Sequence, residues 1–206
     1  MLPLAAAPRW ARLTIGALIA VLLLAVGYTG RYLVEDLRTP GDTSAEAGFA
    51  RDMSTHHAQA VEMAMIVYPK TTRSEIRSMT YNIATSQSME LGIMQTWLTD
   101  WHLSATSSQP RMAWMPGGTK ELSADGLMPG IATKAEIDQL RKATGDQADI
   151  LFCQLMVRHH LGGLHMVEAI LKLTHRDEVR SLAKTMRLAQ TGDVTRMQEL
   201  LAELGG

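Results

Sequence analysis

The sequence contains few of the residues that build disulfides, zinc clusters or nucleic-acid surfaces. Cys153 is the single cysteine, so an intramolecular disulfide and a cysteine-based zinc site are both excluded. The formal net charge is -1, which provides no basic surface for nucleic acid, and we expect no nucleic-acid partner. Aromatic residues make up only 5%, and no stretch alternates apolar and polar residues with the period of a β-strand. The chain is long enough to bury a core, and the missing strand pattern predicts an all-α fold.

Methionine is abundant, with 14 in 206 residues. Its flexible thioether fills gaps in a hydrophobic core, and it is also a ligand that selects soft metal ions such as Cu(I). The methionines can therefore be core residues or metal ligands, and their positions relative to other potential ligands decide between these interpretations.

The N-terminal segment differs from the rest of the chain. Arg9 and Arg12 precede an uncharged, strongly apolar run at 13–30. The run reaches the lower length limit of a membrane-spanning helix, and the cationic flank predicts that the N-terminus stays inside. We expect residues 1–30 to form a single-pass signal anchor in the cell membrane, followed by a tether at 31–43. The alternative is a cleaved signal peptide, which would release a secreted protein; both interpretations place the following domain outside the cytoplasm.

Capping residues divide the exported part into helices. Ser44 is suited to cap a helix that Pro69 ends. Thr72 with Glu75 has the spacing of a capping box, and the same spacing recurs from Thr133 before a shorter helix. Between these helices lies a long loop rich in Ser, Pro and Gly, whose methionines are expected to close one end of the structure. They are Met112, Met115 and Met128. The alternative is a surface site that captures Cu(I).

One sequence frame occurs twice. The stretches FARDMSTHHAQAVEM, from Phe49, and FCQLMVRHHLGGLHM, from Phe152, share F-x-x-x-M-x-x-H-H and a later Met. A shift of 103 residues aligns 49–98 with 152–201 without a gap. The repeated unit is a helical hairpin, and two such hairpins bury their apolar faces best as a four-helix bundle with pseudo-twofold symmetry. The predicted parts are the hairpins 44–101 and 146–204, the crossover 102–145 and, together, the bundle 44–206.

The helical period places the first His of each pair in the core and the second on a flank that faces a neighbouring helix. The two inward stripes are Phe49, Met53, His56, Ala60, Met63 and Val67, and Phe152, Met156, His159, Gly163, Met166 and Ile170. The partner helices carry an amide and a carboxylate among apolar residues. These polar residues are Gln87 and Glu90 in the first hairpin, and Gln190 and Asp193 in the second.

Buried polar groups need partners, and this set has two explanations. In the first, the histidines, amides and carboxylates only hydrogen-bond to one another and fix the packing of the bundle. In the second, imidazole and thioether bind a metal ion, and the amides and carboxylates orient the rings. Four His at symmetric positions, with Met close by along each helix, favour the metal. Di-iron enzymes of helical bundles need a Glu three residues before a His, which neither pair has, so we do not expect that enzyme class.

The stretches FARDMSTHHAQAVEMA, SQSMELGIMQTWL and MPGIATKAEIDQLRKATGDQADILFCQLMVRHH resemble the domain of unknown function 305 (DUF305) family over about 45–203. The resemblance implies a ferritin-like helical bundle that is exported or membrane-anchored, with copper associated with some members. It implies copper as the bound ion and the following candidate ligands: His56, His57, His159, His160, Met53, Met63, Met156 and Met166. Gln87, Glu90, Gln190 and Asp193 would then orient the ligands.

The chain departs from the family pattern at two places. His165 stands where the first copy has Glu62, and the helical period places it on the surface. The second copy has LGG after its His pair where the first has AQA, which lowers helix propensity by roughly 1 kcal/mol per Gly. The sequence thus predicts a membrane-tethered protein that sequesters or transfers copper, with a second copy or another metal-handling protein as candidate partner. The alternative is a structural or interaction module.

Overall fold

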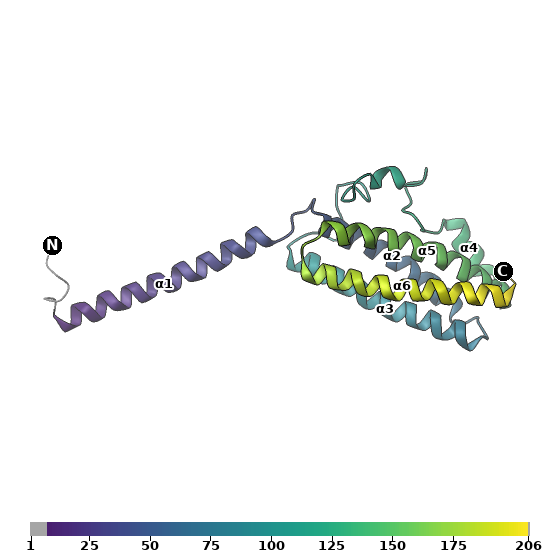
Figure 1. Ribbon diagram of the computed structural model, residues 1–206, viewed down its shortest axis with the longest axis horizontal. Helices are drawn as coiled ribbons and strands as arrows, with labels where there is room; N and C mark the ends of the chain where they lie inside the picture. The colour runs from purple at the N-terminus through teal and green to yellow at the C-terminus, as the bar shows by residue number, and fades with distance from the viewer. Residues whose placement is uncertain (1–7, 206) are drawn as a thin grey trace. The chain divides into compact units, whose positions relative to one another are not determined.

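The computed structural model describes residues 8–205, the side chains of 31–38 excepted. These residues contain no β-strand, and the predicted all-α fold class is confirmed (Figure 1). The helices are α1 (Arg9–Arg38), α2 (Ala45–Val67), α3 (Ser74–Asp100), the 3-10 helix η2 (Gly118–Glu121), α4 (Lys134–Lys142), α5 (Gly145–Leu173) and α6 (Asp177–Leu204).

The chain divides into two compact units, Met1–Thr39 and Pro40–Gly206. The first unit contains α1, whose span Arg9–Gly30 has a mean hydropathy of 2.1 and no buried residue. By length and composition this helix can cross a membrane, although a signal sequence near an N-terminus would meet the same criterion.

The helix boundaries near the N-terminus differ in detail from the expected segments. Residues 1–7 of the expected anchor 1–30 lie outside the described residues. Helix α1 continues past Gly30 to Arg38, so most of the 31–43 segment is helical.

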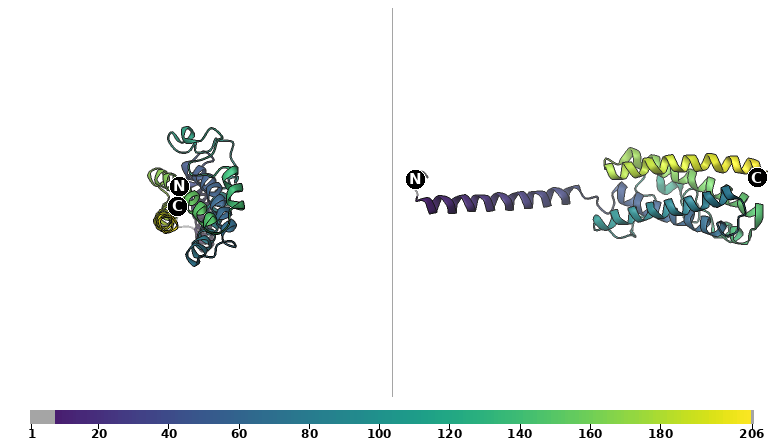
Figure 2. Two further views of the ribbon diagram at one scale, coloured as in Figure 1. Left: turned by 90° about the vertical axis from the view of Figure 1, so that its right-hand side faces the viewer. Right: turned by 90° about the horizontal axis from the view of Figure 1, so that it is seen from below.

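The second unit is a bundle of four long helices built from two hairpins (Figures 1 and 2). Helix α2 packs on α3, α5 packs on α6, and α2 packs on α5. Equivalent contacts join the hairpins at both ends of the bundle. The hydroxyl of Thr71 donates to Asp149 (3.0 Å), and that of Thr174, its counterpart in the repeat, donates to Glu46 (2.8 Å). The shift of 103 residues that aligns the two copies places Thr71 on Thr174 and Glu46 on Asp149. The two contacts are thus equivalent, as a pseudo-twofold arrangement requires.

The predicted caps are confirmed at two helices and wrong at one. The Ser44 side chain accepts from the backbone N–H of Ala47 at the start of α2, and Thr133 forms the capping box of α4. The capping box expected from Thr72 is absent: Arg73 occupies the N-cap of α3 without a side-chain cap. The reason is a local turn in which the hydroxyl of Thr71 accepts from the N–H of Arg73 (3.2 Å).

The core consists of two hydrophobic clusters, one toward each end of the bundle. The first cluster contains Phe49, Met53, Met94, Met112, Met115, Met128, Met166 and Met186 among its buried residues. The second contains Met63, Met79, Phe152, Met156 and Met197. On all four long helices a band of polar residues separates the clusters along the chain. We call this band the polar layer; it comprises His56, His57, Gln87, Glu90, His159, His160, Gln190 and Asp193.

The crossover between the hairpins lies along one side of the bundle (Figure 1). Its first part is held by the carboxylate of Asp52, which accepts from the backbone N–H of Met112 (2.7 Å) and from Nε1 of Trp114 (2.8 Å). Burial raises the pKa of Asp52, and these two hydrogen bonds oppose the rise. The three crossover methionines are buried in the first cluster, which confirms that they close one end of the core.

Candidate functional site

The two inward histidines meet at the centre of the bundle. The rings of His56 and His159 lie with their centroids 3.8 Å apart and their planes inclined by 37°. Both side chains are buried, as the helical period predicts. Because α2 and α5 are the central packed pair of helices, the repeat brings two imidazoles into direct contact.

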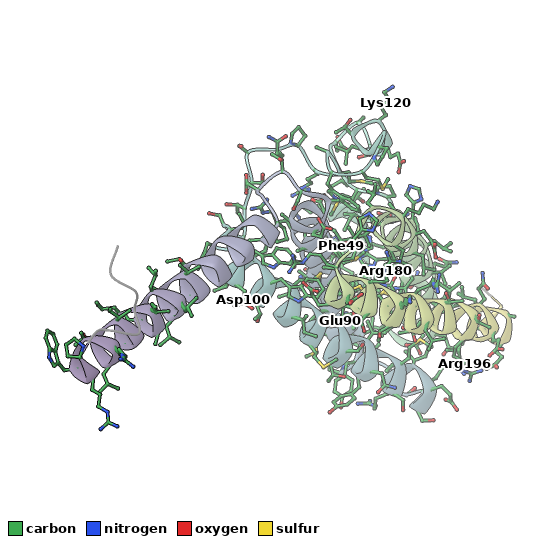
Figure 3. The ribbon with its side chains drawn as sticks, turned by 60° about the vertical axis from the view of Figure 1, so that its left-hand side comes forward. Phe49, Glu90, Asp100, Lys120, Arg180 and Arg196 are labelled. Carbon is green, nitrogen blue, oxygen red and sulfur yellow. The ribbon has the colours of Figure 1, made fainter. Side chains whose placement is uncertain are left out.

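The two flanking histidines each contact a carboxylate on the partner helix of their own hairpin. Nε2 of His57 lies 2.8 Å from Oε2 of Glu90, and Nε2 of His160 lies 3.1 Å from Oδ2 of Asp193. Glu90 is labelled in Figure 3, where it lies on α3. Both His residues are fully buried. The second His of each pair therefore faces a neighbouring helix, as the sequence predicts.

The inward histidines use backbone carbonyls as partners. Nε2 of His56 lies 3.2 Å from the carbonyl oxygen of Pro129, in the crossover. Nε2 of His159 lies 3.0 Å from the carbonyl oxygen of His56 itself, in α2. A carbonyl oxygen only accepts hydrogen bonds, so both Nε2 atoms must carry the proton.

The same reasoning fixes the tautomer of all four rings. A carboxylate is an acceptor, so Nε2 of His57 and of His160 also donate. In a neutral imidazole with Nε2 protonated, Nδ1 carries the lone pair. The Nδ1 atoms of His56, His57, His159 and His160 are all buried without a hydrogen-bond partner. The polar layer therefore contains four buried Nδ1 atoms without a partner, and a neutral histidine protonated at Nε2 binds a metal ion through the lone pair of Nδ1.

Burial keeps three of the rings neutral, those of His56, His57 and His159. Burial and, after it, the neighbouring His57 lower the pKa of His56 to about 3. Burial also lowers the pKa of His57, against the hydrogen bond that His57 donates to Glu90, which raises it. For His159, burial and then the adjacent His56 hold the pKa well below its usual value. These three rings are thus available as neutral ligands at neutral pH without losing a proton.

The remaining predicted residues lie in or beside the polar layer. The amide oxygens of Gln87 and Gln190 are buried without a hydrogen-bond partner. The four predicted methionines are fully buried, with Met53 and Met166 in the first cluster and Met63 and Met156 in the second. They thus flank the layer from both ends of the core. Within residues 8–205, no three His, Cys, Asp or Glu side chains come together as a metal site.

Three residues at the site were missed by sequence reasoning. Pro129 supplies the carbonyl for His56, and Gln59 holds the same part of the crossover. Gly162 gives the crossover room against α5, since a Cβ there would lie 2.1 Å from the carbonyl oxygen of Pro129. The departure from AQA to LGG was the available signal, and the structure explains it as a close approach of two backbones.

Comparison with known proteins places this geometry in a family. The model of a domain of unknown function, DUF305, matches residues 46–201. This chain belongs to the DUF305 family. A DUF305 protein from Streptomyces coelicolor, described as a candidate secreted protein, has a crystal structure with 42% sequence identity and a TM-score of 0.74. The match covers 81% of this chain and 97% of that one.

More distant members share the fold. A DUF305 fragment from Deinococcus radiodurans is 28% identical, with a TM-score of 0.64, over 80% of this chain and 99% of that one. CopM in its Cu(I)-bound form is 23% identical, with a TM-score of 0.59, over 79% and 99%. At that identity the likeness to CopM shows the helical fold alone. No protein with curated annotation matches the sequence.

Proposed function

We propose that this DUF305 protein binds a soft metal cation, Cu(I) above all, in the polar layer and thereby sequesters or transfers it outside the cytoplasm. The observation that carries the proposal is the set of four buried Nδ1 atoms with no hydrogen-bond partner. A buried polar atom without a hydrogen bond costs about 1–3 kcal/mol, so four in one layer need an explanation. A cation that accepts imidazole nitrogen supplies one.

The donor set fits Cu(I) better than zinc. Structural zinc is held by ligands of the His, Cys and carboxylate types and gains little from a thioether. Imidazole suits copper, and the thioethers that flank the layer select its reduced form. His56, His57, His159 and His160 would supply nitrogen, and Met53, Met63, Met156 and Met166 would supply sulfur. The Cu(I)-bound form of CopM, which shares the fold, supports this choice.

The hydrogen bonds around the rings support the proposal that the carboxylates and amides orient the ligands. Glu90 and Asp193 each accept from the Nε2–H of a histidine, which fixes the ring and leaves Nδ1 as the donor atom. Gln87 and Gln190 lie in the same layer, with their amide oxygens free to accept from a ligand or a water molecule.

A second candidate function has its own support. All four Nε2 atoms are hydrogen-bonded, which favours a structural or interaction module in which the layer fixes the packing of the helices and binds no metal. In that case the unpaired Nδ1 atoms would be a tolerated cost of specificity. Metal binding distinguishes the two functions directly.

The test is a competition titration of the protein against a Cu(I) chelator. His56→Ala and His159→Ala should each weaken Cu(I) binding strongly, and Met53→Leu should weaken Cu(I) while sparing zinc. His165→Ala is the matched control, because His165 lies on α5 but is exposed and paired with Glu121. If the protein binds no metal, or if none of the core variants changes the binding, the metal function is rejected and the structural one remains.

We further propose that α1 remains uncleaved and tethers the domain to the cell membrane in a single pass. The apolar span Arg9–Gly30 and its cationic start support this. Protease added outside intact cells should digest the domain and leave α1 in the membrane fraction. A mature protein that begins within or just after the apolar run, free of the membrane, would reject the anchor in favour of a signal peptide.

A further inference from the structure

Residues 128–132 of the crossover, which we call the strap, cross the polar layer on the side of α2 and α5. Met128 begins the strap and is buried in the first hydrophobic cluster. At the other end, the side chain of Gln59 forms two hydrogen bonds with the backbone of Ala132. It accepts from the N–H (2.7 Å) and donates to the carbonyl (2.8 Å). One side chain of α2 therefore fixes the end of the strap.

The middle of the strap lies in backbone contact with α5, and glycines on both sides permit this. A Cβ at Gly162 would lie 2.1 Å from the carbonyl oxygen of Pro129. Gly130 has φ of +84°, a conformation that strongly favours glycine, and a Cβ there would lie 2.7 Å from the carbonyl oxygen of Arg158. The fit leaves no room for a side chain on either surface.

The strap makes one contact that the pseudo-symmetry does not repeat. Its Pro129 carbonyl accepts from Nε2 of His56 (3.2 Å). The corresponding acceptor for His159 is a carbonyl of helix α2 (3.0 Å), which the helix itself holds in place. His56 is therefore the inward histidine whose acceptor belongs to a non-helical segment.

We propose that the strap positions His56 and controls access to the polar layer. The Pro129 carbonyl holds Nε2 in its protonated form and so directs the Nδ1 lone pair into the layer; Gln59 and Gly162 are the positioning residues that hold Pro129. The inward rings are buried among packed helices, and the strap is the non-helical segment that contacts one of them. Displacement of the strap opens the layer. The access part of this proposal rests on the proposed metal function, and the positioning part does not.

The first test removes the side chain that fixes the strap. In the full-length protein in detergent, Gln59→Leu deletes both hydrogen bonds to Ala132 with little change of volume. Modification of His56 by diethyl pyrocarbonate, mapped by mass spectrometry without metal, should accelerate by about tenfold. Release of Cu(I) to a chelator should accelerate by about the same factor. Gln154→Leu is the matched control, since Gln154 is an exposed residue of α5, and both rates should match the wild type.

The second test displaces the carbonyl and observes the tautomer. The Cβ of Gly162→Ala must push Pro129 away, whereas the Cβ of Gly192→Ala, also inside a helix, meets nothing within 4 Å. With 15N-labelled histidine and no metal, His56 of the wild type and of Gly192→Ala should show protonated Nε2 and bare Nδ1. In Gly162→Ala the His56 pattern should shift toward mixed tautomers while that of His159 is retained.

The outcomes separate the two proposals. Unchanged modification of His56 in Gln59→Leu and an unchanged tautomer in Gly162→Ala would overturn the role of the strap, whatever the metal affinity. If Gly162→Ala does not fold, the Gln59→Leu rates alone decide. Changed modification and tautomer in a protein that binds no Cu(I) would support the positioning role and reject the metal function and, with it, control of metal access.

Discussion

The two hairpins carry the same His-His frame but hold their histidines differently. In the first, His57 pairs at 2.8 Å with Glu90, whose side chain is only 6% exposed. In the second, His160 pairs at 3.1 Å with Asp193, which is 34% exposed. A duplicated sequence thus gives one carboxylate closed off from water and one that water can reach. The difference shows that the two His–carboxylate pairs need not contribute equally to stability or be equally accessible to solvent.

The largest effect should come from deleting the flanking histidines one at a time. His57→Ala leaves Glu90 buried without its partner, which should lower the free energy of unfolding by about 3 kcal/mol. His160→Ala leaves a carboxylate that water can solvate, so the loss should be about 1–2 kcal/mol. Urea unfolding of the metal-free protein at pH 7 measures both. Equal losses would show that the difference in burial between the hairpins has no energetic consequence.

The two inward histidines, His56 and His159, should contribute equally to the pH dependence of the free energy of unfolding. Each has a lowered pKa in the native state, about 3 for His56, so below pH 6.5 the unfolded state binds a proton that the native state does not. Stability is therefore retained above pH 6.5 and lost as the pH falls toward the native pKa. Between pH 7 and pH 5 each ring should contribute a loss of about 2 kcal/mol.

Variants isolate this contribution from that of the buried carboxylates. His56→Gln and His159→Gln should each reduce the loss of stability between pH 7 and pH 5, measured by urea unfolding without metal. His165→Gln, at an exposed position, should leave it unchanged. A profile that neither core variant flattens would show that the inward rings are not held neutral.

The smallest effect concerns the glycines of the second hairpin. Ala60 and Gly163 occupy equivalent positions, yet a Cβ at Gly163 would lie 2.6 Å from Oε1 of Gln190 and 3.4 Å from Cε1 of His56. Gly→Ala inside a helix normally stabilises by about 1 kcal/mol, which is the gain expected for Gly192→Ala. Gly163→Ala should give no gain, because Gln190 must move. A thermal unfolding midpoint that rises equally in both variants would show that Gly163 has no packing role.

Much of this arrangement could be predicted from the sequence because it depends on helical period and repetition. The period of 3.6 residues places His56 and His159 inward, and both are buried. The repeat predicts that each flanking His has a carboxylate at the same distance along the chain, and Glu90 and Asp193 are those partners. The crossover methionines were predicted to close the core because apolar side chains in a polar loop need a surface to bury against.

What the sequence could not predict depends on backbone atoms and on local competition. The carbonyl that accepts from His56 belongs to Pro129, and every residue has a carbonyl, so no side-chain pattern marks it. The expected cap at Thr72 failed because the preceding Thr71 takes the N–H of Arg73. The tautomers of the four histidines, and hence the nitrogen that is left as a donor atom for a metal, could be assigned only once the positions of all four hydrogen-bond acceptors were known.

The central claim is that Nδ1 of the histidines in the polar layer binds a soft cation while Nε2 keeps its proton. The most direct measurement is 15N NMR of histidine-labelled protein, recorded before and after addition of Cu(I) under anaerobic conditions. Nδ1 resonances of His56 and His159 should shift on metal addition, with the Nε2–H signals retained and exposed His165 unaffected. Loss of the Nε2–H signals on metal addition, or core resonances that do not change, would contradict the account.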